Sequence, residues 1–347
     1  MKTAASNHLR ASTPTDRLAR ALGIVAGCAL ELTGLAAPVT ALTFSPDGTA
    51  LVCSVGRSVQ VRDPLGATVL REWPCPIAKI TTLRFDPTGR LLAVAGGTPG
   101  ERGEVRLLAW PEGRWIGGGS LPSDLATGLD FDPTGSRFVV SGAEGVARIW
   151  PVTATTNALP ESASPEPEVR LEGHSGPILA VAWDPGGTVI ATTGADRSIK
   201  VWEPSSGRLI RSFTQHTEAP LALAFRPRLP AEAGSEPPAV CATGGDDRTV
   251  RLWQPGIGRM IRIVRPGAGS ILALAWMPDG LSLIAGGTDG TSRVIDAASD
   301  EVLATISDHA DWIFAVAVSP DGSRVASGDA SGQIRVRPSF ALPKPPK

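Results

Sequence analysis

A short turn motif recurs along the whole chain and constrains its fold more than any other feature. Proline fixes φ inside such a turn, and glycine adopts the conformation that ends it. Six copies end in Gly: SPDG at 45–48, DPTG at 86–89, DPTG at 132–135, DPGG at 184–187, MPDG at 277–280 and SPDG at 319–322. Arg226 and Pro227 supply a seventh turn, enlarged by the insertion RLPAEAGSEPP. Seven copies of one unit therefore make up the chain.

The clearest copy of this unit lies between Val169 and Glu203. Four short runs of apolar residues are separated there by Gly, Pro and Asp, at 169–171, 178–183, 189–193 and 199–202. Short apolar runs bounded by such turn residues predict four strands and argue against a helix.

The strand before each turn has a distinctive composition. In every copy, the alternate positions on one side of the strand include a Leu or Val, and the positions on the other side are mostly small residues. The large residues are Leu42, Leu83, Leu129, Val181, Leu223, Leu274 and Val316. A strand buried on both faces loses the alternation of apolar and polar residues, and large side chains facing small ones let neighbouring sheets interdigitate. We therefore expect this strand to be the innermost of each unit.

Four polar or aromatic residues stand between the strands of the clearest unit. They are able to form a hydrogen-bonded relay from carboxylate to imidazole, hydroxyl and indole, which buried polar groups require. The members are His174, Thr192, Asp196 and Trp202, with a second set at His216, Thr243, Asp247 and Trp253. The last unit keeps His309 and Ser327, but at the same spacing it has Ser331 and Arg337 in place of Asp and Trp. We predict a structural role for these relays.

The same unit resembles the WD-repeat family of β-propellers. Gly173 and His174 match the family's Gly-His pair, and Trp202 matches the Trp of its Trp-Asp pair, although Glu203 stands where the family usually has Asp. The resemblance implies four antiparallel strands per blade and blades arranged around a central channel. With seven turns, the expected fold is an all-β, seven-bladed β-propeller.

The two ends of the chain complement each other in this fold. The last repeat ends with the strand Ile334 to Pro338, so blade seven lacks its own outer strand, while Cys28 to Thr33 aligns with an outer strand. We expect this N-terminal strand to close the ring and remove an open edge. The predicted parts are an N-terminal extension at 1–27, disordered or a short helix, the propeller at 28–340 and a C-terminal tail at 341–347. A Pro/Glu/Ser/Thr-rich insertion at 153–168 is expected to be a mobile surface loop.

Charge and apolar content exclude some partners. The chain has 33 basic and 34 acidic residues and no basic block, so we expect no nucleic-acid partner. No apolar run reaches the ~18 residues of a membrane span, and a cytoplasmic location is expected. The alternative is a lipid anchor at Cys28, because Val25 to Cys28 resembles a lipoprotein cleavage box.

The four cysteines show no pairing pattern and are expected to be buried free thiols.

The predicted innermost strands offer two charged residues, Arg84 and Asp130. Propellers that act as metal-dependent hydrolases or quinone dehydrogenases need acids, Asn or His facing the channel. The His, Asp and Thr or Ser sets repeat within single blades and are capped by a Trp that a nucleophilic site does not need. We predict no catalytic residue, metal or cofactor. The alternative is a propeller enzyme, a hydrolase or dehydrogenase, acting on a small molecule at the central channel.

In the family, partners are commonly bound on the top face, where the inner strands begin. By spacing, these positions lie six and four residues before the last residue of each inner strand. Exposed aliphatic and aromatic residues around one rim predict a protein or peptide site, made of Trp312, Phe314, Leu272, Leu221 and Leu179. Asp246, in the tight turn between the second and third strands, is expected beside them and belongs to the same site. For the three leucines, a plain core role remains open. The expected function is a non-catalytic scaffold, a monomeric propeller within a complex.

Overall fold

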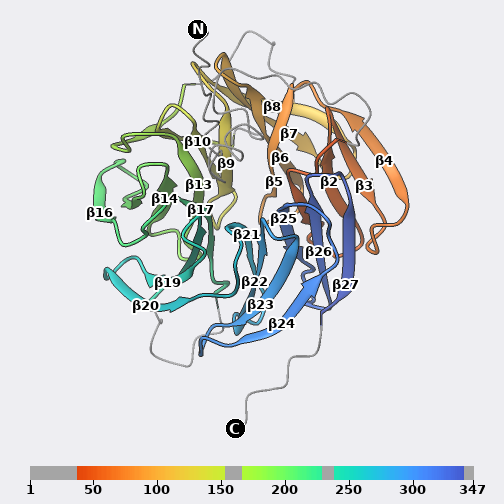
Figure 1. The fold of residues 1–347 in the computed structure, drawn as a ribbon. Helices are drawn as coiled ribbons and strands as arrows, with labels where there is room; N and C mark the ends of the chain where they lie inside the picture. The colour runs from red at the N-terminus through yellow and green to blue at the C-terminus, as the bar shows by residue number, and fades with distance from the viewer. Residues whose placement is uncertain (1–36, 153–165, 229–237, 340–347) are drawn as a thin grey trace, which may run out of the picture.

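The protein is an all-β ring of seven sheets (Figure 1). The structure is a computed structural model and describes residues 37–152, 166–228 and 238–339. Within these ranges every regular element is a strand, and 27 strands form the seven antiparallel sheets. The sheets stand as blades around a central channel, so the predicted seven-bladed β-propeller is confirmed.

The first three blades are built from strands that follow one another along the chain. Blade one comprises β1 (Leu42–Phe44), β2 (Leu51–Val55), β3 (Ser58–Arg62) and β4 (Val69–Pro74). Blade two comprises β5 (Lys79–Phe85), β6 (Leu91–Thr98), β7 (Arg102–Ala109) and β8 (Arg114–Leu121). Blade three comprises β9 (Ala126–Phe131), β10 (Arg137–Gly142), β11 (Val146–Pro151) and β12 (Val169–Glu172).

The remaining blades repeat this order. Blade four comprises β13 (Ile178–Trp183), β14 (Ile190–Gly194), β15 (Ile199–Trp202) and β16 (Leu209–Phe213). Blade five comprises β17 (Pro220–Phe225), β18 (Cys241–Gly245), β19 (Val250–Gln254) and β20 (Arg259–Val264). Blade six comprises β21 (Ile271–Trp276), β22 (Ser282–Gly287), β23 (Thr291–Asp296) and β24 (Val302–Ser307). Blade seven comprises β25 (Ile313–Val318), β26 (Arg324–Asp329) and β27 (Ile334–Pro338).

The recurring turn joins the innermost strand of each blade to the second strand. In blade four, the N–H of Gly187 donates to the carbonyl of Asp184 at 2.9 Å, and Gly187 has a φ of 73°. The carboxylate of Asp184 accepts the N–H of Val189 at 2.7 Å, which holds the start of the next strand. The geometry of this turn therefore explains why Asp184 and Gly187 occupy their positions in the motif.

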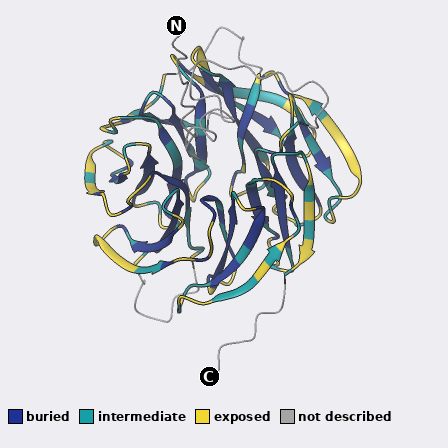
Figure 2. Ribbon diagram, in the orientation of Figure 1, coloured by how far each residue is buried: buried dark blue, intermediate teal, exposed yellow. Residues whose placement is uncertain are grey.

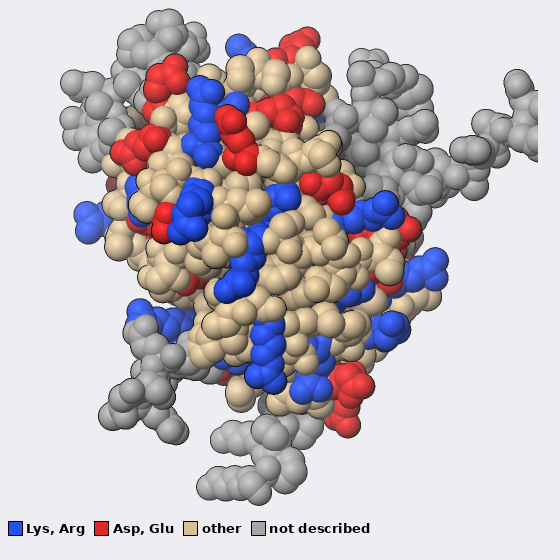
Figure 3. All heavy atoms as spheres, turned by 90° about the vertical axis from the view of Figure 1, so that its left-hand side faces the viewer, with Lys and Arg blue, Asp and Glu red and all other residues tan. Residues whose placement is uncertain are grey.

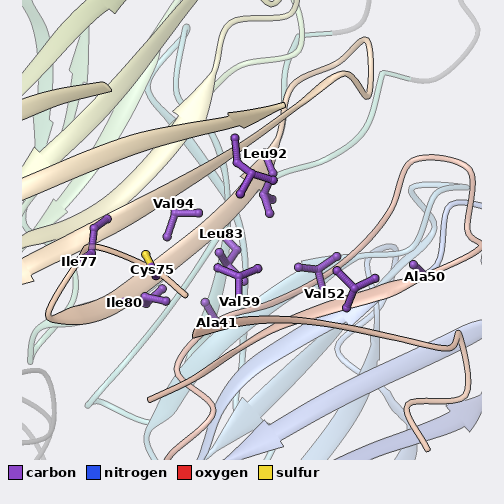
Figure 4. Packing of buried hydrophobic residues seen from close by; sticks show 12 residues of the cluster. Ala41, Ala50, Val52, Val59, Cys75, Ile77, Ile80, Leu83, Leu92 and Val94 are labelled. Atoms are coloured by element: carbon purple, nitrogen blue, oxygen red, sulfur yellow. The ribbon is translucent and has the colours of Figure 1, made fainter. Parts of the chain in front are cut away.

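The hydrophobic core lies between consecutive blades. The core between blades one and two joins Val52 and Val59 to Leu83, Leu92 and Val94 (Figure 4). Buried positions gather near the channel and exposed positions on the outer strands (Figure 2). The seven large Leu and Val residues of the strands before the turns are all buried, which confirms that these strands are innermost.

Arginines on the outer strands tie neighbouring blades together at the circumference. In three blades an arginine at the same register donates to a backbone carbonyl in the next blade's outer turn. The pairs are Arg71 to Pro111 at 2.8 Å, Arg211 to Gly256 at 3.3 Å and Arg262 to Ala298 at 2.5 Å. The ring is thus held by apolar packing inside and by hydrogen bonds outside.

Blades seven and one meet where the ring closes. The N–H of Val39 donates to the carbonyl of Asp329 at 3.0 Å, and Leu42 and Phe44 pack against Ala315 and Ala317. Among the described residues, blade seven has three strands, with β27 outermost. The predicted closing strand at 28–33, the possible short helix and the cleavage-box motif lie outside the described residues, as do most of both insertions.

The described cysteines are free thiols in the core. Cys53, Cys75 and Cys241 are buried free thiols as predicted, and burial raises the pKa of Cys53 and of Cys75 to about 11.

The expectation that Arg84 and Asp130 are the only charged residues of the inner strands is wrong, because β5 already begins at Lys79. In the part of the chain that the structure describes, no helix is long and apolar enough to cross a membrane.

Candidate functional site at the channel mouth

The same register position lines the channel in all seven blades. It lies four residues before the last residue of each inner strand and is occupied by Thr40, Thr81, Thr127, Leu179, Leu221, Leu272 and Phe314. Blades one to three present threonine at this position, whereas blades four to seven present leucine or phenylalanine. The channel mouth therefore has a hydroxyl-bearing wall and an apolar wall.

The apolar wall is one continuous cluster. Leu221 and Leu272 are only 6 % and 9 % exposed and pack with Ala219, while Leu179, Trp312 and Phe314 are partly buried against them. The rings of Trp312 and Phe314 meet edge to face, with centroids 6.3 Å apart. The structure thus brings together five of the six residues proposed for partner binding. Leu221 and Leu272 form the floor of this cluster, and the other three are its more accessible part.

Asp246, the sixth residue, lies at the edge of the apolar cluster. Its N–H donates to the carbonyl of Ala219 at 3.0 Å, so the tight turn between β18 and β19 borders the cluster. Thr288 holds the matching place in blade six, where its N–H donates to the carbonyl of Ser270 at 3.0 Å. Both side chains are half-buried.

The threonines of the opposite wall link blades to one another. Thr40 donates its hydroxyl to the carbonyl of Ile80 in blade two at 2.6 Å, and Thr81 donates to the carbonyl of Ala126 in blade three at 2.8 Å. Thr127 contacts Ser141 within its own blade at 2.9 Å. These hydroxyls therefore fix the geometry of the first three blades.

Arg84 and Asp130 lie deeper on the same polar wall. The guanidinium Nε is 3.9 Å from a carboxylate oxygen, and the other carboxylate oxygen accepts the N–H of Trp183 at 2.9 Å. Burial raises the pKa of Asp130, against the opposing effect of Arg84. Asp130 thus joins blade three to blade four. The described ranges contain no group of three or more His, Cys, Asp or Glu placed to hold a metal ion.

The four relay residues of blade four lie in hydrogen-bond contact. His174 Nδ1 is 3.0 Å from Asp196 Oδ2, and His174 Nε2 is 2.8 Å from Thr192 Oγ1. Trp202 Nε1 donates to the same hydroxyl at 2.8 Å. Because the carboxylate only accepts and the indole only donates, His174 carries its proton on Nδ1 and Thr192 donates to Nε2.

Blade five repeats this arrangement and adds a cation. His216 lies 2.8 Å from both Asp247 and Thr243, and Trp253 donates to Thr243 at 2.8 Å. Arg251, which is also buried, donates to the same carboxylate at 2.9 Å. The hydroxyls of Thr192 and Thr243 are fully buried between imidazole and indole. They lack the open side that a nucleophile must present to its substrate.

Blade seven departs from the spacing expected from the sequence. Its relay carboxylate is Asp329, whose Oδ2 lies 2.8 Å from His309 Nδ1, and Ser327 lies 2.7 Å from Nε2. The expectation that Ser331 stands in place of the acid is therefore corrected, since the last residue of β26 supplies the carboxylate. Ser331 instead donates to Asp329 at 2.7 Å, and Arg337 at the Trp position donates to Asp308.

We predict that stability falls as the pH is lowered from 7 through the ordinary range of histidine. Burial lowers the pKa of His174, so the unfolded chain takes up that proton first and stability is lost as the pH drops below about 6.5. Burial would raise the pKa of Asp196, but hydrogen bonds from Ser198 and Ser175 outweigh it and lower the pKa to about 2. That carboxylate therefore adds a second loss as the pH falls from about 3.8 towards 2.

Urea unfolding between pH 5 and 7.5 checks the first part. The His174→Gln variant should show a shallower pH dependence of its midpoint than wild type across that range. Identical slopes for the two proteins would remove His174 from the explanation.

Comparison with known proteins agrees with this architecture. The profile of the family described as WD domain, G-beta repeat matches residues 27–63, 165–203, 207–254, 259–296 and 300–337. The chain belongs to the WD-repeat family. No matched repeat covers residues 64–164, yet the structure shows strands β4 to β11 within them.

Relatives match over part of their length. The chain is 29 % identical over 132 residues to a Poly(A)+ RNA export protein of Schizosaccharomyces pombe, which covers 38 % of this chain and 33 % of that protein. It is 24 % identical over 168 residues to the F-box-like/WD repeat-containing protein TBL1X of Homo sapiens, covering 48 % of this chain and 26 % of the relative. The mouse TBL1X matches similarly, with 28 % of its length covered. The chain thus spans about a third or less of these relatives.

Proposed function

We propose that this protein is a non-catalytic scaffold that binds a protein or peptide partner at the mouth of its channel, on the apolar wall of blades four to seven. One observation carries the proposal. Five large apolar residues from four different blades form one cluster at the start of the inner strands, and three of them are only partly buried. A surface cluster of this kind is typical of interaction sites.

The side chains suit an anchor-type interaction. Tryptophan is favoured at the centre of interfaces, and Trp312 is positioned by Phe314 on one side and by the hydrogen bond from the N–H of Ala330 to its own carbonyl on the other. Leu221 and Leu272 give the cluster a rigid floor, which limits the entropy lost on binding. Asp246 at the edge would add a polar contact that orients the partner.

Replacing Trp312 with alanine is expected to weaken partner binding by about 2 kcal/mol or more, roughly thirtyfold in Kd. The melting temperature should change little, because Trp312 precedes β25 and is only partly buried. Partners captured by the wild-type protein would be identified by mass spectrometry, and their Kd measured by titration against both proteins.

Leu281→Ala is the matched control for this test. Leu281 is also an exposed apolar residue, but it follows the turn after β21 and so lies at the opposite end of that strand from Leu272. Its replacement should leave Kd unchanged. A captured partner that binds the Trp312 variant as tightly as wild type would refute the proposed site.

A further inference from the structure

The outer edges of blades four and five carry a local excess of positive charge. Residues 200–213 and 254–265 contain one acid, Glu203, and six bases: Lys200, Arg208, Arg211, Arg259, Arg262 and Arg265. Arg208 pairs with Glu203 at 3.2 Å, which leaves the other bases without a carboxylate in these segments. Figure 3 shows Lys and Arg side chains along this side of the molecule, with Asp and Glu side chains gathered mainly in the upper part of the view. The chain as a whole is nearly neutral, so this strip is distinctive.

The same strip exposes apolar side chains. Leu209, Ile257, Met260 and Ile261 are between 36 % and 57 % exposed and make up half of the large hydrophobic residues that are exposed among the described residues. The two blades form one surface here, because Arg211 of β16 donates to the carbonyl of Gly256 in the turn before β20. We call this surface, from Lys200 to Phe213 and Gln254 to Arg265, the β16–β20 strip.

The strip also includes an open strand edge. In the part of the chain that the structure describes, β20 pairs with β19 only and is the outermost strand of its sheet. Its first three residues are exposed. An outermost strand presents unpaired N–H and C=O groups, which an extended segment of another chain is able to join.

The arginines retain capacity for a ligand. Arg211 and Arg262 each give one N–H to a carbonyl in the next blade, and a guanidinium has five. The backbone of Arg259 pairs with Gln254 of β19, whereas no described residue forms a hydrogen bond or ion pair with its guanidinium, which stands exposed at the start of β20. These groups hold positive charge beside both the apolar side chains and the open edge.

We propose that the β16–β20 strip binds an acidic, extended segment of a partner protein, which adds as a strand to β20. Its backbone would pair with the open edge, its carboxylates would face Arg259 and the neighbouring arginines, and its apolar side chains would cover Met260 and Ile261. Charge complementarity indicates that the partner segment is negatively charged. The apolar half of the strip favours a protein over a nucleic acid, whose phosphate backbone offers no apolar contacts. This surface is separate from the channel mouth and does not depend on the function proposed for it.

A labelled peptide of about eight alternating Glu and Val residues, within the usual range of strand lengths, serves as the probe. Fluorescence anisotropy with the full chain measures its Kd at low and at physiological salt. Wild type should bind this peptide more tightly than the matching Lys/Val peptide. A version with proline at alternate positions should bind weakly, because it lacks the N–H groups needed for strand pairing.

Two variants and two matched controls locate the site. Arg259→Glu and Ile261→Glu should each weaken binding by about fivefold or more, equivalent to about 1 kcal/mol. Arg114→Glu changes the residue of β8 that has the same register as Arg259, and Leu70→Glu changes the matching position of β4 for Ile261. Both controls should bind like wild type. Melting curves would show that all four variants are folded.

Three outcomes would overturn the proposal. The first is no binding of the Glu/Val peptide at low salt, and the second is equal weakening by the control variants. The third is equal binding of the proline-containing peptide, which would reduce the effect to charge attraction without strand addition. A single-stranded RNA oligonucleotide would be titrated in parallel. Tighter RNA binding that Arg259→Glu abolishes and Ile261→Glu leaves intact would assign the strip to nucleic acid and reject a protein partner.

Discussion

The Asp247→Ala variant should unfold with a free energy lower than that of wild type by about 3–5 kcal/mol, the usual cost of leaving a buried charge without its partner. Asp247 is almost fully buried and accepts hydrogen bonds from His216 and Arg251 at 2.8 Å and 2.9 Å. Its removal strands a buried guanidinium as well as an imidazole. Chemical denaturation of purified variants measures the loss.

Blade four provides the matched comparison. Asp196 has the same place in its relay, but none of the described arginines contacts it, and its neighbours are Ser175, Ser198 and His174. Asp196→Ala should therefore cost less, about 1–3 kcal/mol for unsatisfied neutral partners. Equal losses at the two positions would contradict the role given to Arg251.

A double variant separates the two contributions within blade five. Replacing Arg251 with methionine in the Asp247→Ala background removes the stranded charge and should recover part of the lost stability. The Arg251→Met single variant completes the cycle, and the coupling energy of the pair is the loss of the double variant minus the sum of the two single losses. Neither variant should change the affinity of a partner bound at Trp312, since both residues belong to the relay and neither is part of the apolar cluster.

The number of blades could be predicted from the sequence because each blade contains one copy of a turn that follows local rules. Pro and Gly at fixed places determine φ within four residues, and nothing distant is needed to interpret them. The turn at Asp184 and Gly187 forms as these rules require. Blades two and three were recognisable in this way even though they lack the relay histidine.

The acid of blade seven could not be predicted because a fixed offset from the histidine does not determine which carboxylate reaches the imidazole. Ser331 stands at the offset that works in blade four, but the imidazole selects whichever carboxylate reaches Nδ1 in space. Asp329 does so from the end of β26, two residues earlier. Hydrogen-bond geometry, and not spacing, decides such a partner.

The candidate surfaces also depend on contacts in space that spacing along the sequence does not determine. The offset that identified Leu179, Trp312 and Phe314 depends on one strand at a time, so the sequence was sufficient to bring them to one end of the ring. It did not show that Leu221 and Leu272 are largely buried. The β16–β20 strip was missed for a different reason: its arginines come from two segments about fifty residues apart, and neither segment alone is a basic block.

Deleting residues 1–33 is expected to destabilise the ring, whereas deleting residues 1–20 should be tolerated. Blade seven has three strands among the described residues, and β27 is largely exposed, while each of the other six blades has a fourth strand. The family profile begins at residue 27, so its first repeat includes the segment 28–33 that we propose as the closing strand. A strand of this length adds about three or four ladder hydrogen bonds at about 1 kcal/mol each.

Loss of that strand would have two measurable effects. The melting temperature should fall by about 5 °C, since a loss of about 3–4 kcal/mol is divided by an unfolding entropy of about 2.1 cal/mol/K per residue. The open edge of β27 should also promote association, visible as higher-order species in size-exclusion chromatography. The shorter deletion controls for removal of the extension itself. If the longer deletion melts like wild type and stays monomeric, the strand at 28–33 does not close the ring, and the contacts of Val39, Leu42 and Phe44 with blade seven are sufficient to hold it.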